Sequence, residues 1–210
     1  MLPLINWLSK HKAVNLVLLG IYYLLAVLPH EQVGVFISKK VRKPMGLEAY
    51  DRIMLQIAIA GLLLYGIVVI WNIIRKPKQI PTLFYLIANI CFASASVYAL
   101  FVLNIEAIHF FQYAILALLL FPLLRSYSMT LFWGTLLGAI DEAYQYFYLS
   151  PDRTDYFDFN DVILDLIGVA FGLILIRSFN PNIAKIKSWL NKPIAITSIG
   201  IVLLLSLIHI

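Results

Sequence analysis

Apolar runs long enough to cross a lipid bilayer follow one another along nearly the whole chain. Of the 210 residues, 62% are hydrophobic and only 13% are charged, which is far more apolar than a typical soluble domain. A helix needs about 20 apolar residues to cross the roughly 30 Å of hydrocarbon in a bilayer. The repeated runs therefore predict an all-α fold, a polytopic transmembrane helix bundle.

We count about seven spans, at 13–28, 53–74, 81–103, 110–124, 129–149, 162–176 and 193–208. The first run follows a basic N-terminal stretch but has no small-x-small cleavage site after it, so we expect a retained span rather than a signal peptide. Residues 180–192 alternate apolar and basic side chains, which predicts a short interfacial helix. No polar stretch is long enough to form a soluble domain, so we expect one compact membrane domain.

The net charge of +5 does not indicate a nucleic-acid ligand, because Lys and Arg lie in short loops between the apolar runs. We expect no nucleic-acid partner, since no basic stripe with interleaved aromatic residues occurs. If the N-terminus is cytoplasmic, loops 104–109 and 150–161 lie outside and carry Arg153 as their only cation. This pattern predicts a multi-pass protein of the cell membrane. The basic loop 30–52 falls on the same outer side, so the absolute topology stays open.

Polar residues interrupt two of the apolar runs. Asp141, Glu142 and Gln145 lie in run 129–149, and Asp165 lies early in run 162–176. Each ionised carboxylate near the centre of a membrane helix costs about 2.5–3.5 kcal/mol, and three could cost up to about 9 kcal/mol. Leu or Phe would span the bilayer without this cost, so such residues indicate a functional site.

Polar side chains from three successive spans should meet at one membrane face. Successive spans run in opposite directions, so the start of the fourth, the end of the fifth and the start of the sixth share one side. We predict a polar pocket there, which the loop charges place on the outer face, with Arg153 as a partner of the buried acids. The predicted binding residues are His109, Tyr113, Asp141, Glu142, Gln145, Arg153, Asp161 and Asp165.

Two glycine pairs accompany these polar residues. Gly134 with Gly138, and Gly168 with Gly172, are each four residues apart, in the fifth and sixth spans. Small residues at this spacing let membrane helices approach closely. We therefore expect the fifth and sixth helices to pack tightly against each other.

The ordered motifs of the second half resemble the VanZ-like family of bacterial membrane proteins. They are His-Phe-Phe-Gln-Tyr at 109–113, Asp-Glu-x-x-Gln at 141–145, Pro-x-Arg at 151–153 and Asp-x-x-x-Asp-x-x-Gly-x-x-x-Gly at 161–172. The resemblance covers about residues 104–176, and Asp165 departs from it, because the family pattern usually has Asn there. It divides the chain into N-terminal spans (1–103), VanZ-like core spans (104–176) and an interfacial helix with a last span (177–210).

The family is named for a protein that gives low-level resistance to teicoplanin, a lipoglycopeptide antibiotic. The resemblance therefore implies a role at the cell envelope, and our leading hypothesis is binding of an amphipathic envelope molecule. This would be a lipid-linked cell-wall precursor or a lipoglycopeptide, with Arg153 and Gln145 at its polar headgroup and the carboxylates as hydrogen-bond acceptors. Membrane lipids are the other expected partners, no cofactor is expected, and the oligomeric state stays open.

Other interpretations of the same residues stay open. In a membrane enzyme, one of the candidates Asp141, Glu142 and Asp165 would act as general acid or base on a lipid-linked substrate. In a proton-coupled transporter the acids would form a relay, although their position near one face argues against a path through the bilayer. The polar residues could instead lock the bundle as a buried network, with His109 as an anchor. Carboxylates and His109 could also bind a metal, but Asp161 with Asp165 is the only short ligand-like spacing, so we expect none.

Overall fold

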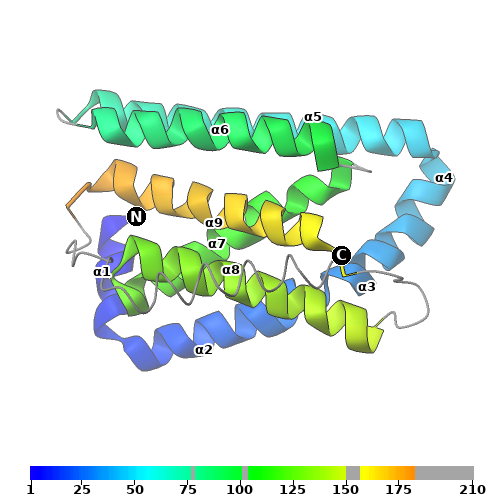
Figure 1. The fold of residues 1–210 in the computed structure, drawn as a ribbon, viewed down its shortest axis with the longest axis horizontal. Coiled ribbons are helices and arrows are strands. Elements are labelled where there is room, and N and C mark those ends of the chain that lie inside the picture. Colours follow the sequence, from blue (N-terminus) through cyan, green and yellow to red (C-terminus); the bar gives the residue numbers. More distant parts are fainter. Residues whose placement is uncertain (77–78, 101–103, 150–156, 183–210) are drawn as a thin grey trace.

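The computed structural model describes residues 1–76, 79–100, 104–149 and 157–182, and their regular elements are all helical (Figure 1). The all-α fold class is therefore confirmed. The α-helices are α1 (Leu2–Lys10), α2 (Lys12–Tyr22), α3 (His30–Ile37), α4 (Lys43–Met45), α5 (Leu47–Ile74), α6 (Ile80–Leu100), α7 (Ile108–Leu124), α8 (Tyr127–Tyr144) and α9 (Phe159–Phe179). The π-helical segments are η1 (Tyr23–Val27), η2 (Ser38–Arg42) and η4 (Gln145–Leu149), and η3 (Asn104–Ala107) is a 3-10 helix.

Helix α9 lies at the centre of the bundle and contacts α5, α6, α7 and α8. The antiparallel pair α5 and α6 lies on one side of α9, and α7, α8 and α2 lie on the other side (Figure 1). In the most apolar window of each helix, 67% of the residues of α9 are buried, against 6% in α5. The sequence of α5 is as apolar as that of α9, so its side chains are suited to face lipid rather than a protein core.

Local residue chemistry sets the turn between α7 and α8. Pro122 lies in the last turn of α7, where its missing N–H weakens the helix, and Arg125 ends α7 in the left-handed conformation (φ 50°). Ser126 then starts α8 as its N-cap, and its side chain accepts a hydrogen bond from the backbone N–H of Met129. This two-residue connection makes α7 and α8 antiparallel neighbours (Figure 1).

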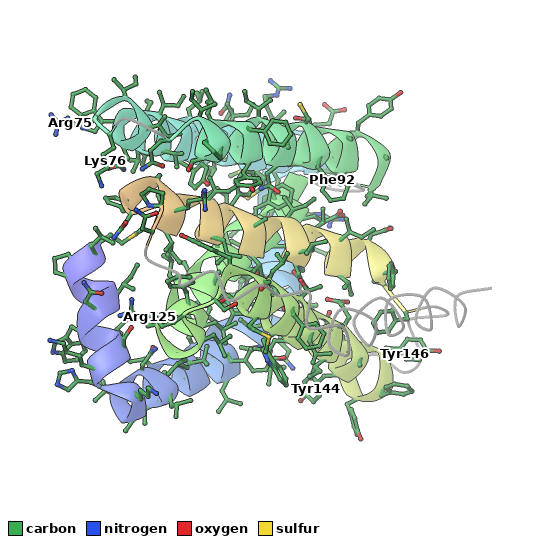
Figure 2. The ribbon with its side chains drawn as sticks, turned by 60° about the vertical axis from the view of Figure 1, so that its left-hand side comes forward. Arg75, Lys76, Phe92, Arg125, Tyr144 and Tyr146 are labelled. Carbon is green, nitrogen blue, oxygen red and sulfur yellow. The ribbon has the colours of Figure 1, made fainter. Side chains whose placement is uncertain are left out.

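The C-terminal end of α9 is satisfied by the connection between α5 and α6. Nε2 of Gln79 donates to the backbone oxygen of Ser178 at 2.9 Å, and Nζ of Lys76 donates to that of Phe179. These are among the carbonyls that the last turn of a helix leaves without internal partners. Figure 2 shows Arg75 and Lys76 at this end of the bundle, opposite the end where Tyr146 lies.

The count of about seven spans is not confirmed. In the described residues, four helices are long and apolar enough to cross a membrane: Leu47–Ile74, Ile80–Leu100, Ile105–Leu124 and Phe159–Phe179. A fifth span results if Leu2–Lys10 and Lys12–Val27, which are bent by 108° to each other, count as one. Run 129–149 forms α8 and η4 but is not among the candidate spans; besides Asp141 and Glu142, α8 contains Ser128, Thr130 and Thr135, which make it less apolar. The predicted span 193–208 and most of the interfacial helix 180–192 lie outside the described residues.

The basic loop predicted at 30–52 is instead mostly helical. Helix α3, η2 and α4 follow one another without a break, and Gly46 separates them from α5. Gly46 has φ +87° and ψ 148°, a backbone conformation that is essentially restricted to glycine. The chain therefore changes direction at this residue before it enters α5.

Candidate functional site

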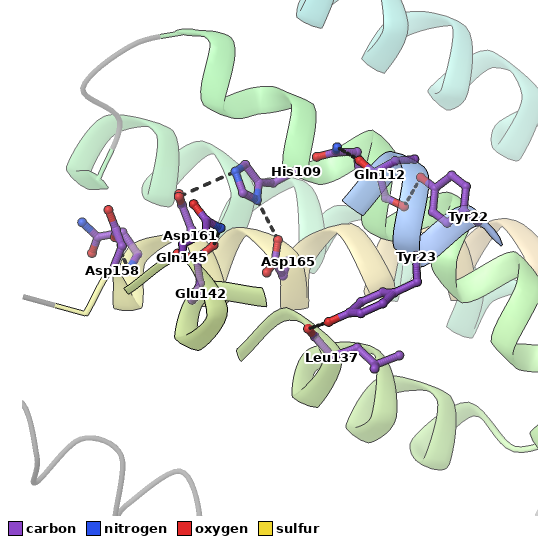
Figure 3. Close-up of polar contacts among 12 residues, drawn as sticks. Tyr22, Tyr23, His109, Gln112, Leu137, Glu142, Gln145, Asp158, Asp161 and Asp165 are labelled. Carbon is purple, nitrogen blue, oxygen red and sulfur yellow. Dashed lines mark hydrogen bonds and ion pairs between the residues drawn. The ribbon is translucent and has the colours of Figure 1, made fainter. Parts of the chain in front are cut away.

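The start of α7, the end of α8 and the start of α9 meet at one end of the bundle, as the alternation of spans predicts (Figure 3). We call the polar side chains there the polar cluster. They are His109 and Tyr113 of α7, Asp141 and Glu142 of α8, Gln145 of η4, and Asp161 and Asp165 of α9. Most of the cluster is shielded from solvent, because His109, Tyr113, Asp141, Glu142 and Asp165 are all buried.

His109 lies between two carboxylates of α9. Its Nδ1 is 2.8 Å from Oδ1 of Asp165, a hydrogen bond between two buried side chains. Its Nε2 is 3.7 Å from Oδ2 of Asp161, whose side chain is 19% exposed. Asp161 and Asp165 are four residues apart, so both lie on the side of α9 that faces α7. The imidazole thus connects a fully buried carboxylate with one at the accessible edge of the cluster.

Glu142 and Gln145 form the part of the cluster that α8 and η4 contribute. Nε2 of Gln145 donates to Oε1 of Glu142 at 2.9 Å, and Glu142 is only 3% exposed. The neighbouring Asp141 is fully buried and lies within electrostatic range of Glu142 and Tyr113. The end of α8 therefore supplies two further carboxyl groups to the same interior.

Tyr113 lies one helical turn after His109 and packs beside it. The two rings are nearly parallel, with an interplanar angle of 7° and a centroid separation of 6.4 Å. The side chain of Tyr113 is fully buried, and its hydroxyl has no hydrogen-bond partner among the described residues. The same holds for Oδ2 of Asp165. Because buried polar groups are normally paired, these two atoms are candidates for contacts with a bound molecule or water.

Close helix approach brings these side chains together. A Cβ atom on Gly138 of α8 would lie 2.3 Å from Oδ2 of Asp165, and one on Gly168 of α9 would lie 2.7 Å from the backbone oxygen of His109. Gly134 and Gly138 thus face α9, as expected for the fifth and sixth spans. Gly168 and Gly172 instead face α7, since Cβ atoms there would meet α7 residues. A larger residue at either position on α9 would force α7 away.

The end of α2 and the start of η1 complete the site, which the sequence did not indicate. Oη of Tyr23 in η1 donates to the backbone oxygen of Leu137 at 2.7 Å, and Tyr23 lies within electrostatic range of Asp141, Glu142 and Asp165. Next to it, Oη of Tyr22 donates to the backbone oxygen of Gln112 at 2.9 Å. The pair of tyrosines inside the apolar run 13–28 was the only signal, and aromatic residues in such a run do not by themselves indicate a polar contact.

Of two further polar residues between α8 and α9 in the sequence, the structure describes Asp158 but not Arg153. Arg153, the predicted cationic partner of the acids, lies outside the described residues. Asp158 is the N-cap of α9, and its Oδ1 accepts a hydrogen bond from the backbone N–H of Asn160 at 3.1 Å. Its role is therefore to start α9, which positions Asp161 in the first turn and Asp165 one turn later.

The described part of the cluster does not have the form of a metal centre. No group of three or more His, Cys, Asp or Glu side chains within the described residues could hold a metal ion. His109 and Asp165 contact each other directly through a hydrogen bond instead. The arrangement is suited to accepting hydrogen bonds and to passing a proton between carboxylate and imidazole.

A family model described as VanZ/LLP1 matches residues 16–180. The chain belongs to this VanZ-like family. The matched range begins well before residue 104, so it includes η1 with Tyr23 as well as the helices that carry the polar cluster. No curated protein and no solved structure matches the chain. The VanZ-like assignment, together with the apolar helices, identifies a multi-pass membrane protein.

Proposed function

We propose that this VanZ-like protein binds an amphipathic molecule of the cell envelope, with its polar headgroup at the polar cluster and its apolar tail along the lipid-facing helices. The observation that carries the proposal is the burial of three carboxyl side chains, Asp141, Glu142 and Asp165, at one end of a membrane bundle. Intramembrane acids are costly to insert and mark functional sites by default. The candidate ligands are a lipid-linked cell-wall precursor or a lipoglycopeptide, and glycopeptide resistance would be a consequence of such binding.

The accessible edge of the cluster is where we propose that the headgroup binds. Asp161 is partly exposed, and Gln145 beside Glu142 is also only partly buried. Their oxygens can accept hydrogen bonds from the hydroxyl or amino groups of a headgroup. Deeper in the cluster, Oη of Tyr113 and Oδ2 of Asp165 are available to a group that reaches further in. Arg153 remains our proposed cationic contact for the same headgroup.

We also propose that the polar cluster faces outward in the cell membrane. In the described residues, Asp and Glu occur in elements at the cluster's end of the bundle. The opposite end carries six cations, Lys10, Lys12, Arg75, Lys76, Arg125 and Arg177, against five at the cluster's end, Lys39, Lys40, Arg42, Lys43 and Arg52. The positive-inside rule favours a cytoplasmic position for the end of the bundle that carries more Lys and Arg residues.

Lipid retention tests the proposal. Wild type and the double variant Asp141→Asn, Glu142→Gln would be purified from the same cells, and the bound lipids identified by mass spectrometry. The double variant Glu48→Gln, Asp51→Asn is the matched control, because it makes the same chemical changes at this end of the bundle but outside the polar cluster. We expect the first variant to lose lipid species that wild type and the control retain. Identical profiles in all three would contradict the proposal.

Stability measured on the same proteins separates binding from a structural role. If the buried acids only lock the bundle, the cluster variant unfolds more easily while its lipid profile stays unchanged. If they bind a ligand, the profile changes, and added lipid extract stabilises wild type more than the variant. Both results come from one set of preparations.

The contact between His109 and Asp165 favours a second candidate function, a membrane enzyme acting on a lipid-linked substrate. Asp165 holds Nδ1 of His109, so Nε2 points toward the accessible edge, where it could take or give a proton. Incubation of the protein with a total lipid extract of the expression host is the test. A product formed by wild type and absent with His109→Gln would support catalysis. Unchanged lipids with both proteins would count against it.

The described residues do not favour the third hypothesis, a proton-coupled transporter. Such a protein uses titratable groups at several depths of the bilayer. In the described chain the carboxyl groups of α8 and α9 lie near His109, at one end of the bundle (Figure 3). Binding therefore stays our first proposal and catalysis the second.

A further inference from the structure

We infer that the helical segment formed by α3, η2 and α4, residues 30–45, lies in the membrane interface and binds anionic lipid headgroups of the leaflet at the cluster's end. We call this segment the connecting helix, since it links η1 to α5. It shares no residue with the polar cluster. The inference therefore stands or fails separately from the proposed ligand.

Large apolar side chains of the connecting helix are left uncovered by the other described residues. Phe36 is 62% exposed, Val33 is 50% exposed and Met45 is 44% exposed. The principal contacts of the segment are among its own parts and with α5. In Figure 1 it crosses the edge of the bundle at which α7 and α9 begin and α8 ends. This edge coincides with the level at which the membrane-spanning helices α5 and α7 begin, so the segment is at the boundary between lipid and water.

Cations are concentrated in the second half of the same segment. Lys39, Lys40 and Lys43 are exposed, and Arg42 is partly buried. Residues 30–45 contain these four cations and one acid, Glu31, which gives a formal charge of 4 − 1 = +3 with neutral histidine. The charge of the segment therefore complements an anionic surface.

A lipid headgroup region suits both sets of side chains at once. Exposed Phe, Val and Met side chains gain by entering the boundary of the acyl chains, while the long lysine stems let the ammonium groups stay among the phosphates. A soluble anionic partner would leave the apolar side chains in water. A neutral lipid surface would cover them but leave the cations unpaired, so the combination indicates anionic lipids.

A fluorescent probe on the connecting helix tests this inference. Phe36→Cys in a Cys91→Ser background gives one cysteine, because Cys91 is the only native one. The full chain, labelled with an environment-sensitive dye, would be placed in nanodiscs of phosphatidylcholine alone or of equal amounts of phosphatidylcholine and phosphatidylglycerol. We expect a shift to shorter emission wavelength in the discs with phosphatidylglycerol. We also expect strong quenching by lipids that carry a spin label near the headgroup.

Two triple variants of the labelled protein identify the cause of the shift. Lys39→Gln, Lys40→Gln, Lys43→Gln should abolish the dependence on phosphatidylglycerol, as should high salt. The control Lys10→Gln, Lys12→Gln, Arg75→Gln removes three exposed cations at the opposite end and should leave it intact. Emission typical of water in both kinds of disc would overturn the inference. So would a shift that persists in the first triple variant, or one that is equal in both lipid compositions.

Discussion

Gly138→Ala is the substitution whose effect the structure allows us to work out most fully. A Cβ atom at Gly138 would lie 2.3 Å from Oδ2 of Asp165, whereas ordinary contact begins at 3.4 Å. Oδ2 would have to move by 3.4 − 2.3 = 1.1 Å. Asp165 is fully buried, and its Oδ1 is 2.8 Å from Nδ1 of His109, so a movement of this size is enough to break that hydrogen bond.

Three contributions determine the expected loss of stability. An extra methyl group in a packed interior costs about 1–3 kcal/mol. Loss of a hydrogen bond to a charged group costs about 1.5–3 kcal/mol. Alanine regains about 0.5–1 kcal/mol through its better helix propensity. We therefore expect Gly138→Ala to lower the free energy of unfolding by about 2–5 kcal/mol.

Gly66→Ala is the matched control for this experiment. Gly66 also lies inside a long helix, but a Cβ atom there would have nothing within 4 Å. The propensity gain is common to both variants, so the difference between them measures the clash with Asp165. Unfolding in mixed micelles with an increasing proportion of sodium dodecyl sulfate, followed by circular dichroism, gives both values. If Gly138→Ala were as stable as Gly66→Ala, the close packing of α8 on α9 at Asp165 would be refuted.

Three further changes test other parts of the structure in the same unfolding assay. Tyr23→Phe removes the hydrogen bond to the backbone oxygen of Leu137 and should cost about 0.5–1.5 kcal/mol; an unchanged value would argue against η1 as part of the site. Gln79→Leu leaves the backbone oxygen of Ser178 without its side-chain donor and should cost about 1–3 kcal/mol, and no loss would contradict this cap of α9. Gly46→Ala forces a side chain into the conformation at φ +87° and should cost about 1–3 kcal/mol, and a neutral result would mean that the chain does not turn there as described.

The helical membrane fold and the meeting of three polar segments could be predicted because both follow from simple patterns. Long apolar runs specify helices that cross lipid, and alternating directions bring every second helix start to the same side. His109, Glu142, Asp161 and Asp165 accordingly lie together. The number of spans could not be predicted in this way. The length of an apolar run does not show whether a polar helix such as α8, or a bent pair such as α1 with α2, counts as a span.

The contacts within the site depended on packing that the sequence does not express. Spacing placed Gly168 and Gly172 on one face of α9, but only the structure shows that this face meets α7 rather than α8. Likewise, no pattern connects Tyr23 with Leu137, which are more than a hundred residues apart.

The sequence by itself determined that this chain forms membrane helices, which of their ends carry the acids, and that the second half resembles the VanZ-like family. The tertiary structure decided that His109 pairs with Asp165, that η1 closes the site, and that the basic stretch before α5 is a helix. The physical reason is that hydrophobic periodicity fixes the type and direction of each helix. Which face of one helix meets which face of another is set by the fit of individual side chains, and the small space above Gly138 and Gly168 decides that fit here.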